Sequence, residues 1–350
     1  MKIHEKYMVR CVQLAKNGLG TTYPNPMVGS VIVHNNKIIG EGWHKKSGEP
    51  HAEVNAINSV INKELLAEST IYVSLEPCSH YGKTPPCSDL IIAKGIKKVI
   101  IGTVDPFNEV SGRGIKKLLE AGCEVQVGVL ENLCQDLNKR FFTFHNKKRP
   151  YIILKWAESA DGFIAPDSSK RDKKKPFWIT NSASKQLVHK WRSEEQSILV
   201  GSTTAKTDNP SLTTREWYGN SPTRIVIDKN LSINKDNYLY DASVTTLIIT
   251  EAESTHSKNL KYYEADFNSD LPMQICDILH TEGLQSVIIE GGAQTLQHFI
   301  DAGLWDEARV FKGAVYFKSG IKSPLLNTAK EAGSTGYTGD FLTYYLNKND

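Results

Sequence analysis

The sequence lacks the features of membrane, secreted and strongly charged proteins. It contains no apolar run near the ~18–20 residues that a membrane-spanning helix needs, and the opening residues, MKIHEK, contain no apolar stretch of the kind found in a secretory signal. The formal net charge is +3, from 42 basic and 39 acidic residues, which does not by itself indicate a nucleic-acid partner. We therefore expect a cytoplasmic protein that acts on a small molecule and has no nucleic-acid or membrane partner.

Further absences argue against a disulfide-rich fold, a repeat fold and a Rossmann dinucleotide domain. The six cysteines show no short-range disulfide framework. No internal repeat is evident, and without a G-x-G-x-x-G fingerprint a Rossmann dinucleotide domain is not indicated. At 350 residues the chain is long enough for two domains, each with its own core. The charged stretch at residues 146–150, which ends in Pro150, is typical of a linker. We therefore predict domains at residues 1–146 and 150–350.

The pattern of apolar residues predicts helices and strands in both domains. Helical periodicity covers residues 5–18, 51–61, 115–121, 184–192 and 294–302, and strand-like runs cover residues 28–33, 37–43, 71–75, 97–102, 124–129, 151–156, 197–201, 223–228, 244–250 and 286–290. A turn is expected at Asn35-Asn36, between the first two strands. Both domains are therefore expected to belong to the α/β class.

A histidine, a glutamate and two cysteines are spaced as a catalytic zinc site requires. Pro50 suggests that a helix begins near His51, which would bring His51 and Glu53 together in its first turn. Cys78 follows a strand, and Cys87 precedes an apolar helix. One imidazole and two thiolates leave a fourth tetrahedral position for water, and a glutamate that is not a ligand can pass that water's proton to a leaving amine. The pattern indicates hydrolytic deamination of an aminopyrimidine-like ring.

A strand, two glycines and a helix follow one another in the second domain. Gly291 and Gly292 stand between the strand at residues 286–290 and a helix that begins near Gln294. Free N–H groups at the start of a helix can bind a pyrophosphate, and glycine lets the backbone approach it closely. Taken alone, the two glycines fit a plain tight turn equally well.

These motifs closely resemble those of a known family, the bifunctional deaminase/reductase of riboflavin biosynthesis. The resemblance to its deaminase half lies at residues 24–29, 42–44, 51–53, 75–80 and 82–87. The resemblance to its reductase half lies at residues 154–155, 159–162, 178–180, 207–215, 224–228 and 290–292. The usual deaminase pattern is H-x-E followed by P-C-x-x-C. Here the second cysteine comes only at Cys87, and this longer gap is the one expected in the family. The resemblance covers nearly the whole chain, with the deaminase half first, as in bacteria.

The resemblance implies a fold and two reactions. The fold is an N-terminal cytidine-deaminase-like α/β/α domain and a C-terminal dihydrofolate-reductase-like α/β domain. The first domain would use one zinc ion to remove the 2-amino group of 2,5-diamino-6-ribosylamino-4(3H)-pyrimidinone 5′-phosphate. The second would use NADPH to reduce the ribosyl side chain, giving 5-amino-6-ribitylamino-uracil 5′-phosphate. A homo-oligomer, dimer or tetramer, formed through the reductase domain is also expected.

The resemblance also implies roles for individual residues. In the deaminase half, it makes His51, Cys78 and Cys87 the zinc ligands and Glu53 the catalytic residue, with Asn25, His44, Lys83 and Asp105 at the substrate. In the reductase half, it places Lys155, Arg192, Leu212, Arg215 and Glu290 at the substrate, and Ala157, Trp178, Thr180, Thr204, Asp208, Gly291 and Gly292 at the cofactor. Arg192 and Arg215 could each hold a substrate phosphate through the guanidinium fork. Lys155 and Glu290 are candidates for polarising or protonating the sugar oxygens as hydride arrives.

Two positions depart from the family pattern. After Asp105-Pro106, Phe107 stands where the family has the asparagine of an Asp-Pro-Asn-Pro motif. Pro176 stands where the family commonly has a serine, so a hydroxyl contact to the substrate is lost or supplied by another residue. The basic loop at residues 170–175 is expected to be a solvated excursion, and attraction of a phosphate is the alternative.

Two other functions were compared with this one. A deaminase of tRNA or nucleosides with an accessory domain predicts a basic, aromatic-bearing face around the zinc, and the small net charge argues against it. A non-catalytic interaction module predicts a broken zinc set, whereas His51, Glu53, Cys78 and Cys87 are all present. The bifunctional enzyme is therefore the preferred interpretation.

Overall fold

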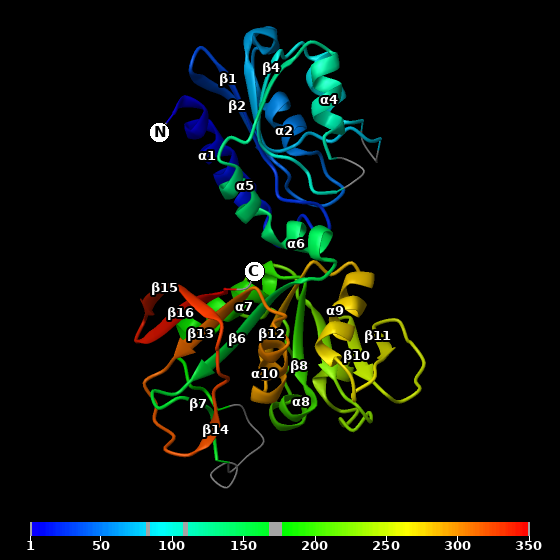
Figure 1. Cartoon of the computed structure of the whole chain (residues 1–350), viewed down its shortest axis with the longest axis vertical. Coiled ribbons are helices and arrows are strands. Elements are labelled where there is room, and N and C mark those ends of the chain that lie inside the picture. Colours follow the sequence, from blue (N-terminus) through cyan, green and yellow to red (C-terminus); the bar gives the residue numbers. More distant parts are fainter. Residues whose placement is uncertain (1, 82–84, 108–110, 168–176, 349–350) are drawn as a thin grey trace. The chain divides into compact units, whose positions relative to one another are not determined.

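Figure 1 shows the computed structural model of the protein, which describes residues 2–81, 85–107, 111–167 and 177–348. The chain divides into two compact units, Met1–Lys148 and Arg149–Asp350, which are described separately below as the N-terminal and C-terminal units. The sequence predictions on Lys83, on Pro176 and on the loop at residues 170–175 lie outside the described residues.

A five-stranded sheet forms the centre of the N-terminal unit. The strand order is β2-β1-β3-β4-β5, with β1 (Gly29–His34), β2 (Lys37–Trp43), β3 (Thr70–Leu75), β4 (Lys98–Thr103) and β5 (Glu124–Val127). β1 runs antiparallel to β2 and β3, whereas β3, β4 and β5 are parallel. The predicted turn between the first two strands is confirmed. Asn35 and Asn36 have φ of 48° and 62°, a left-handed conformation that asparagine tolerates.

Helices cover both faces of this sheet because its strands direct apolar residues alternately to each side. The helices are α1 (Ile3–Ala15), α2 (Ala52–Ser59), α3 (Cys87–Ala93), α4 (Arg113–Glu120), α5 (Glu131–Leu137) and α6 (Lys139–Lys147), with short 3-10 turns at Lys16–Gly18 and Lys63–Glu68. Val31 and Val33 of β1 belong to one apolar cluster with residues of α1 and α5. Ile32 belongs to another with residues of α2, α3 and α4. The result is the predicted α/β/α arrangement (Figure 1).

The C-terminal unit is built on a nine-stranded sheet. Its order is β11-β10-β9-β8-β12-β6-β13-β16-β15, with β6 (Tyr151–Glu158), β8 (Ser197–Gly201), β9 (Thr223–Ile227), β10 (Thr246–Thr250), β11 (Leu260–Glu264), β12 (Ser286–Gly291), β13 (Glu307–Lys312), β15 (Ala329–Tyr337) and β16 (Asp340–Asn347). All neighbouring pairs are parallel except β13 with β16 and β16 with β15. The carboxyl ends of seven parallel strands therefore lie along one edge, where α/β proteins place their ligands.

Helices also cover both faces of the second sheet. They are α7 (Ser182–Glu194), α8 (Ser202–Asp208), α9 (Leu271–Thr281) and α10 (Ala293–Asp301), together with a 3-10 turn at Tyr238–Tyr240. Residues of α7 pack with one face of the sheet, and residues of α9 and α10 pack with the other. A separate two-stranded ribbon pairs β7 (Phe163–Pro166) with β14 (Gly320–Lys322). The predicted α/β class is thus confirmed in both units.

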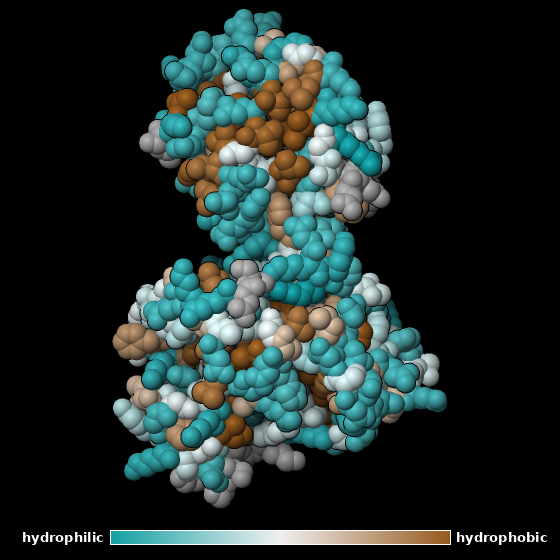
Figure 2. Space-filling model, viewed as in Figure 1, coloured by the Kyte–Doolittle hydropathy of each residue, from teal (hydrophilic) through white to brown (hydrophobic). Residues whose placement is uncertain are grey.

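The surface of the C-terminal unit is mainly hydrophilic on the face shown in Figure 2, with small apolar areas between the polar residues. Within the part of the chain that the structure describes, no helix is both long enough and apolar enough to cross a bilayer.

Candidate active sites

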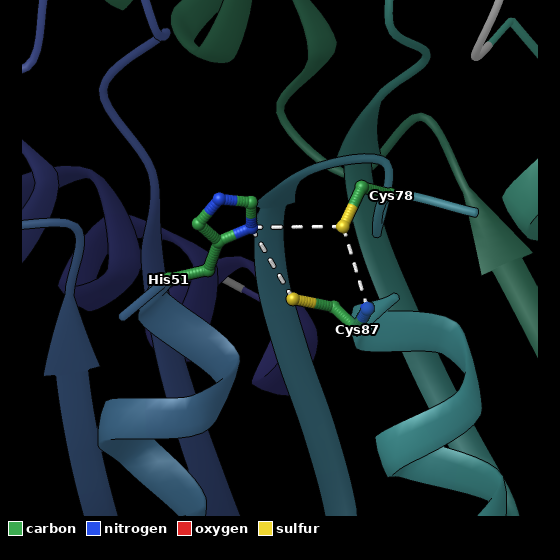
Figure 3. Close-up of side chains that lie close together, drawn as sticks. All are labelled: His51, Cys78 and Cys87. Atoms are coloured by element: carbon green, nitrogen blue, oxygen red, sulfur yellow. Dashed lines mark hydrogen bonds between the residues drawn. The ribbon is translucent and has the colours of Figure 1, made fainter. Parts of the chain in front are cut away.

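Three segments of the N-terminal unit bring His51, Cys78 and Cys87 together (Figure 3). His51 is the extended residue just before α2, with φ −71° and ψ 168°, so Glu53 follows in the first turn of that helix. Cys78 comes shortly after the end of β3, and Cys87 is the first residue of α3. The predicted helix start, which was needed for His51 and Glu53 to converge, is thus present.

The donor atoms of these three residues have the spacing of zinc ligands. His51 Nδ1 lies 3.6 Å from Cys78 Sγ and 3.4 Å from Cys87 Sγ, and all three atoms lie within 4.8 Å of one another. Zn–N and Zn–S bonds of ~2.0 and ~2.3 Å in a tetrahedron separate nitrogen from sulfur by about 3.5 Å. Within the described ranges, no other group of His, Cys, Asp and Glu side chains is arranged for a metal ion.

The two thiols differ in acidity, because the pKa of Cys78 is lowered whereas the Cys78 side chain and burial raise the pKa of Cys87. The Cys87 side chain and His51 lower the pKa of Cys78. The backbone N–H of Cys87 also donates to Cys78 Sγ at 3.3 Å, which stabilises a thiolate there. The donor set and its spacing therefore fit a zinc ion with three protein ligands.

Glu53 is buried beside the three candidate ligands. Its exposed fraction is 3%. Burial, and then the charge of Cys78, raise its pKa to about 7. A carboxyl group with a pKa near neutral can both take up and release a proton under ordinary conditions.

Asn25 and His44 lie next to the same site. The His44 ring centroid is 5.2 Å from that of His51. His44 Nδ1 is 3.2 Å from the Pro50 carbonyl, which can only accept a hydrogen bond, so Nδ1 carries the proton. His44 Nε2 then accepts from Asn25 Nδ2 at 3.1 Å. Burial lowers the pKa of His44, which keeps this imidazole neutral.

Asp105 lies in the loop that follows β4. The side chain is buried, and burial raises its pKa to about 6. Its Oδ1 accepts a hydrogen bond from the backbone N–H of Phe107 at 2.8 Å. The Phe107 ring packs against His145 of α6, with ring centroids 5.1 Å apart. Phe107, the departure from the family pattern, is therefore accommodated by an aromatic contact.

Glu76 has a part in this site that the sequence reasoning missed. It stands two residues before Cys78, and its buried carboxylate accepts hydrogen bonds from four backbone N–H groups between Asp105 and Ile115. A carboxylate placed directly before the Pro-Cys pair was the available signal, but the sequence does not show what such a residue contacts.

A cavity of about 670 Å³ opens at the carboxyl ends of β6, β8, β9 and β12 in the C-terminal unit. Nine of the predicted reductase residues line it: Lys155, Ala157, Trp178, Thr180, Thr204, Asp208, Glu290, Gly291 and Gly292. Arg192, Leu212 and Arg215 do not. The structure thus brings together all the predicted cofactor residues and part of the predicted substrate set.

The two glycines form a backbone turn at one side of this cavity. Gly291 has φ 130°, a conformation that favours glycine, and Gly292 is the residue from which α10 starts. A Cβ atom at Gly292 would lie 3.4 Å from Thr204 Oγ1, so the turn packs closely against α8. The start of α10 thereby faces the cavity with free backbone N–H groups.

Two charged residues of the predicted substrate set, Arg192 and Glu290, form an ion pair. Arg192 donates to Glu290 through Nε at 3.3 Å and Nη2 at 2.7 Å, and its Nη1 donates to the Thr213 carbonyl at 3.4 Å. Burial alone would raise the pKa of Glu290, but the charges of Arg192 and Lys155 lower it to about 2. Burial also lowers the pKa of Lys155. The guanidinium fork of Arg192 is therefore already occupied by a carboxylate.

The other two predicted substrate residues lie on the segment after α8. Leu212 has φ 53°, and its side chain is buried in an apolar cluster. Arg215 is exposed, and its backbone N–H donates to His189 Nδ1 at 3.2 Å. Burial, with the nearby charges of Arg192 and Arg215, lowers the pKa of His189 to about 4. The sequence reasoning missed His189, although its position three residues before Arg192 on α7 places both on one helix face.

Two further cavity residues, Lys229 and His298, were also missed. Lys229 follows β9, and His298 is on α10. The signal for Lys229 was a cation at the end of an apolar strand, where a parallel sheet presents its ligand-binding edge.

Two family models match separate parts of this chain. Residues 1–103 match the family described as the cytidine and deoxycytidylate deaminase zinc-binding region, and residues 150–317 match the RibD C-terminal domain. The riboflavin biosynthesis protein RibD of Aquifex aeolicus is 40% identical over 320 residues, covering 89% of this chain and 86% of the relative. RibD of Escherichia coli is 35% identical over 326 residues, covering 88% of this chain and 86% of the relative.

Solved structures resemble the whole chain. The diaminohydroxyphosphoribosylaminopyrimidine deaminase/5-amino-6-(5-phosphoribosylamino)uracil reductase of Thermotoga maritima has a TM-score of 0.87 and 36% identity, and covers 99% of each chain. RibD of Acinetobacter baumannii has a TM-score of 0.86 and 28% identity, again over 99% of each chain.

Proposed function

The chain belongs to the RibD family of bifunctional deaminase/reductases of riboflavin biosynthesis, and from this premise we propose which of its residues carry each reaction. The first reaction is the zinc-dependent hydrolytic deamination of 2,5-diamino-6-ribosylamino-4(3H)-pyrimidinone 5′-phosphate. The second is the NADPH-dependent reduction of the ribosyl side chain to give 5-amino-6-ribitylamino-uracil 5′-phosphate. The match of residues 150–317 to a reductase domain of this family leaves no basis for the tRNA or nucleoside deaminase considered above.

The deaminase assignment depends mainly on the spacing of three donor atoms. His51 Nδ1 lies 3.4 and 3.6 Å from the two sulfurs, so His51, Cys78 and Cys87 would hold the zinc ion. When bound, zinc lowers the pKa of a coordinated water to about 7. Glu53 takes a proton from the attacking water and delivers it to the amino group, which leaves as ammonia. A pKa of about 7 suits Glu53 to both transfers.

Asn25, His44 and Asp105 would bind the pyrimidine. The proton on His44 Nδ1 is held by the Pro50 carbonyl, and this fixes the orientation of the Asn25 amide through His44 Nε2. Asn25 can then offer both a donor and an acceptor to the edge of the ring. Asp105 is proposed to accept hydrogen bonds from ring substituents. Lys83, outside the described residues, remains a proposed substrate contact on the family resemblance.

In the C-terminal unit, the cavity would hold NADPH, which supplies the hydride. The N–H groups at Gly292 and the start of α10 would bind the pyrophosphate. Ala157, Trp178, Thr180, Thr204 and Asp208 would line the rest of the cofactor site. Lys229, which also lines the cavity, would add a positive charge for a cofactor phosphate.

The proton needed for the reduction is assigned to Lys155 rather than to Glu290. With a pKa of about 2, Glu290 is a carboxylate at neutral pH and has no proton to donate. Lys155 has a lowered pKa, and its ammonium group is therefore a stronger acid than an exposed lysine. We assign Glu290, held by Arg192, to orient the sugar hydroxyls, and the exposed Arg215 to bind the 5′-phosphate.

A coupled assay tests these roles. Purified protein is supplied with the diaminopyrimidinone ribotide, and ammonia release and NADPH oxidation are followed separately for wild type and Glu53→Gln. Ammonia is expected first, with Glu53→Gln releasing about 10²–10⁴-fold less. The same variant should oxidise NADPH normally when the deaminated intermediate is supplied. Ammonia release at the wild-type rate by Glu53→Gln would refute its catalytic role.

We also propose that the protein is cytoplasmic and forms a homo-oligomer through its C-terminal unit. All six cysteines are free, and a thiolate site of this kind needs a reducing compartment. β15 is an edge strand with a mostly exposed side-chain row, and such edges readily pair with another chain. Light scattering of the purified chain and of the separate C-terminal unit tests the oligomer. A monomer in both samples would refute it.

A further inference from the structure

We infer that Glu76 is a positioning residue for the deamination: its carboxylate fixes both ends of the loop that carries Asp105. The inference rests on the proposed role of Asp105 in binding the pyrimidine. Glu76 itself is not placed at the substrate, and neither reaction uses it directly. Its effect would pass through the backbone N–H groups that it accepts from, at Asp105, Gly112, Gly114 and Ile115.

The contacts of Glu76 reach the beginning and the end of this loop. Oε2 accepts from the N–H of Asp105 at 3.4 Å and of Gly112 at 3.0 Å. Oε1 accepts from the N–H of Gly114 at 2.9 Å and of Ile115 at 3.2 Å. One side chain, 4% exposed, thus joins the segment after β4 to the first turn of α4.

The four N–H donors around the Glu76 side chain favour a carboxylate at this position. An ionised carboxylate only accepts hydrogen bonds and has two oxygens, so it can satisfy four N–H groups. A glutamine at this position would turn its own NH₂ group toward two of those donors. The start of α4 carries partial positive charge, which offsets the burial of the negative side chain.

The backbone around Glu76 is also closely fitted to the loop. Gly112 has φ 75°, a conformation that favours glycine. A Cβ atom at Gly114 would lie 2.0 Å from the Pro77 carbonyl oxygen, so the first turn of α4 packs directly on the residue after Glu76. The N–H of Glu76 donates to the Thr103 carbonyl at 3.0 Å, which ties it to the end of β4.

These contacts determine where the Asp105 side chain lies. The Asp105 carboxylate is already held by the N–H of Phe107, two residues further on. The bond from the Asp105 N–H to Glu76 fixes the other side of the same residue. Cys78 is only two residues from Glu76, so the segment after β3 places both a candidate zinc ligand and the anchor of the Asp105 loop.

A double-mutant cycle tests the inference in the full-length protein. Wild type, Glu76→Gln, Asp105→Asn and the double variant are compared in ammonia release from the diaminopyrimidinone ribotide. Each single change is expected to lower kcat/KM by about tenfold, mainly through KM, because a small misplacement of a binding group is costly. The double variant should be no worse than Asp105→Asn alone, because both changes remove the same interaction.

Three controls accompany the cycle. Zinc content and NADPH oxidation with the deaminated intermediate should match wild type in every variant. Glu68→Gln, an exposed glutamate of the same unit, should leave ammonia release unchanged. If Glu76→Gln does not fold, Glu76→Asp replaces it, because aspartate keeps the charge but has a shorter reach, and the same lack of additivity is expected.

Several outcomes would overturn the inference. Losses that multiply in the double variant would mean that Glu76 acts independently of Asp105. Loss of zinc from Glu76→Gln would mean that Glu76 supports the metal ligands instead, and a wild-type KM would mean that it has no positioning role. If Asp105→Asn alone has no effect, the proposed role of Asp105 fails, which is a separate result.

Discussion

The two sites of this chain are assembled in different ways. The candidate zinc ligands and Glu53 lie within residues 51–87, at the start of α2, after β3 and at the start of α3. The cavity of the C-terminal unit draws on residues from Lys155 to Ile321, contributed by several strand ends and helices. The first site depends on a few donor atoms at fixed separations. The second combines a larger cavity with charged residues that neutralise one another, of which Lys155 and Glu290 line the cavity and Arg192 does not.

The two sites therefore differ in the substitutions that they tolerate. A metal site loses its function when one ligand is lost, because the remaining donors no longer hold the ion. Removing one member of the charged set Lys155, Glu290 and Arg192 leaves a buried charge unbalanced. This lowers the stability of the unit as well as its catalytic activity. The substitutions below test that contrast, in order of decreasing expected loss.

Removing a zinc ligand should have the largest effect. Cys87→Ala is expected to lower ammonia release by at least about 10³-fold, because the zinc ion loses one of three protein ligands. Zinc content by elemental analysis should fall with it, while NADPH oxidation with the deaminated intermediate stays at the wild-type rate. Cys123→Ala, a buried cysteine outside the ligand set, is the matched control and should keep its zinc. Full zinc content in Cys87→Ala would contradict the ligand assignment.

Removing the proposed proton donor should be the next largest effect. Lys155→Met keeps the length of the side chain and is expected to lower kcat for NADPH oxidation by about 10²-fold, because the sugar oxygen loses its acid. NADPH binding, followed by cofactor fluorescence, should change little. Lys206→Met on α8, outside the cavity, is the control. A loss confined to NADPH affinity would place Lys155 at the cofactor instead.

Breaking the Arg192–Glu290 pair should mainly affect stability. Arg192→Met leaves a buried carboxylate without its main partner and is expected to destabilise the C-terminal unit by about 3 kcal/mol in denaturant unfolding. Adding Glu290→Gln should recover part of this loss.

The same pair gives a pH dependence. The pKa of Glu290 is about 2 in the folded protein against an ordinary 4.5. Its contribution to the stability of the folded protein is therefore present above pH 4.5 and is lost as pH falls toward 2. Arg192→Met should raise the Glu290 pKa and move acid unfolding to higher pH. An unchanged acid transition would contradict this account.

The smallest expected effect concerns His189. The unfolded chain takes up a proton at this histidine near pH 6.5, but the folded chain does so only near pH 4. The folded state therefore loses stability as pH falls through that range. His189→Gln retains an acceptor for the Arg215 N–H, and its melting temperature should fall by roughly a few degrees less than that of wild type between pH 7 and 4. If the melting temperatures of His189→Gln and wild type fall equally between pH 7 and 4, a group other than His189 causes the loss of stability.

The predictable parts of these sites were those fixed by local sequence. Pro50 indicated the start of α2, and this start is what allows His51 and Glu53 to converge. The glycine pair between a strand and a helix indicated the turn at Gly291-Gly292. Strand-like runs located most of the parallel strands because buried strands are continuously apolar.

The remaining features depend on contacts between distant segments. Glu76 acts on backbone N–H groups 29 or more positions away, and Arg192 is committed to Glu290, 98 positions away. The family resemblance predicts that Leu212 contacts the substrate, and its side chain is buried in an apolar cluster of the C-terminal unit. The hairpin of β15 and β16 was not predicted, because most residues of β15 are exposed and polar and lack an apolar pattern.

Zinc-edge X-ray absorption of the purified protein would detect all three proposed zinc ligands in one experiment. With one zinc ion per chain, we expect a shell of two sulfur atoms at ~2.3 Å, one imidazole nitrogen at ~2.0 Å and one further light atom. A shell of four sulfurs, a shell without sulfur, or a protein that does not bind zinc would contradict the site formed by His51, Cys78 and Cys87.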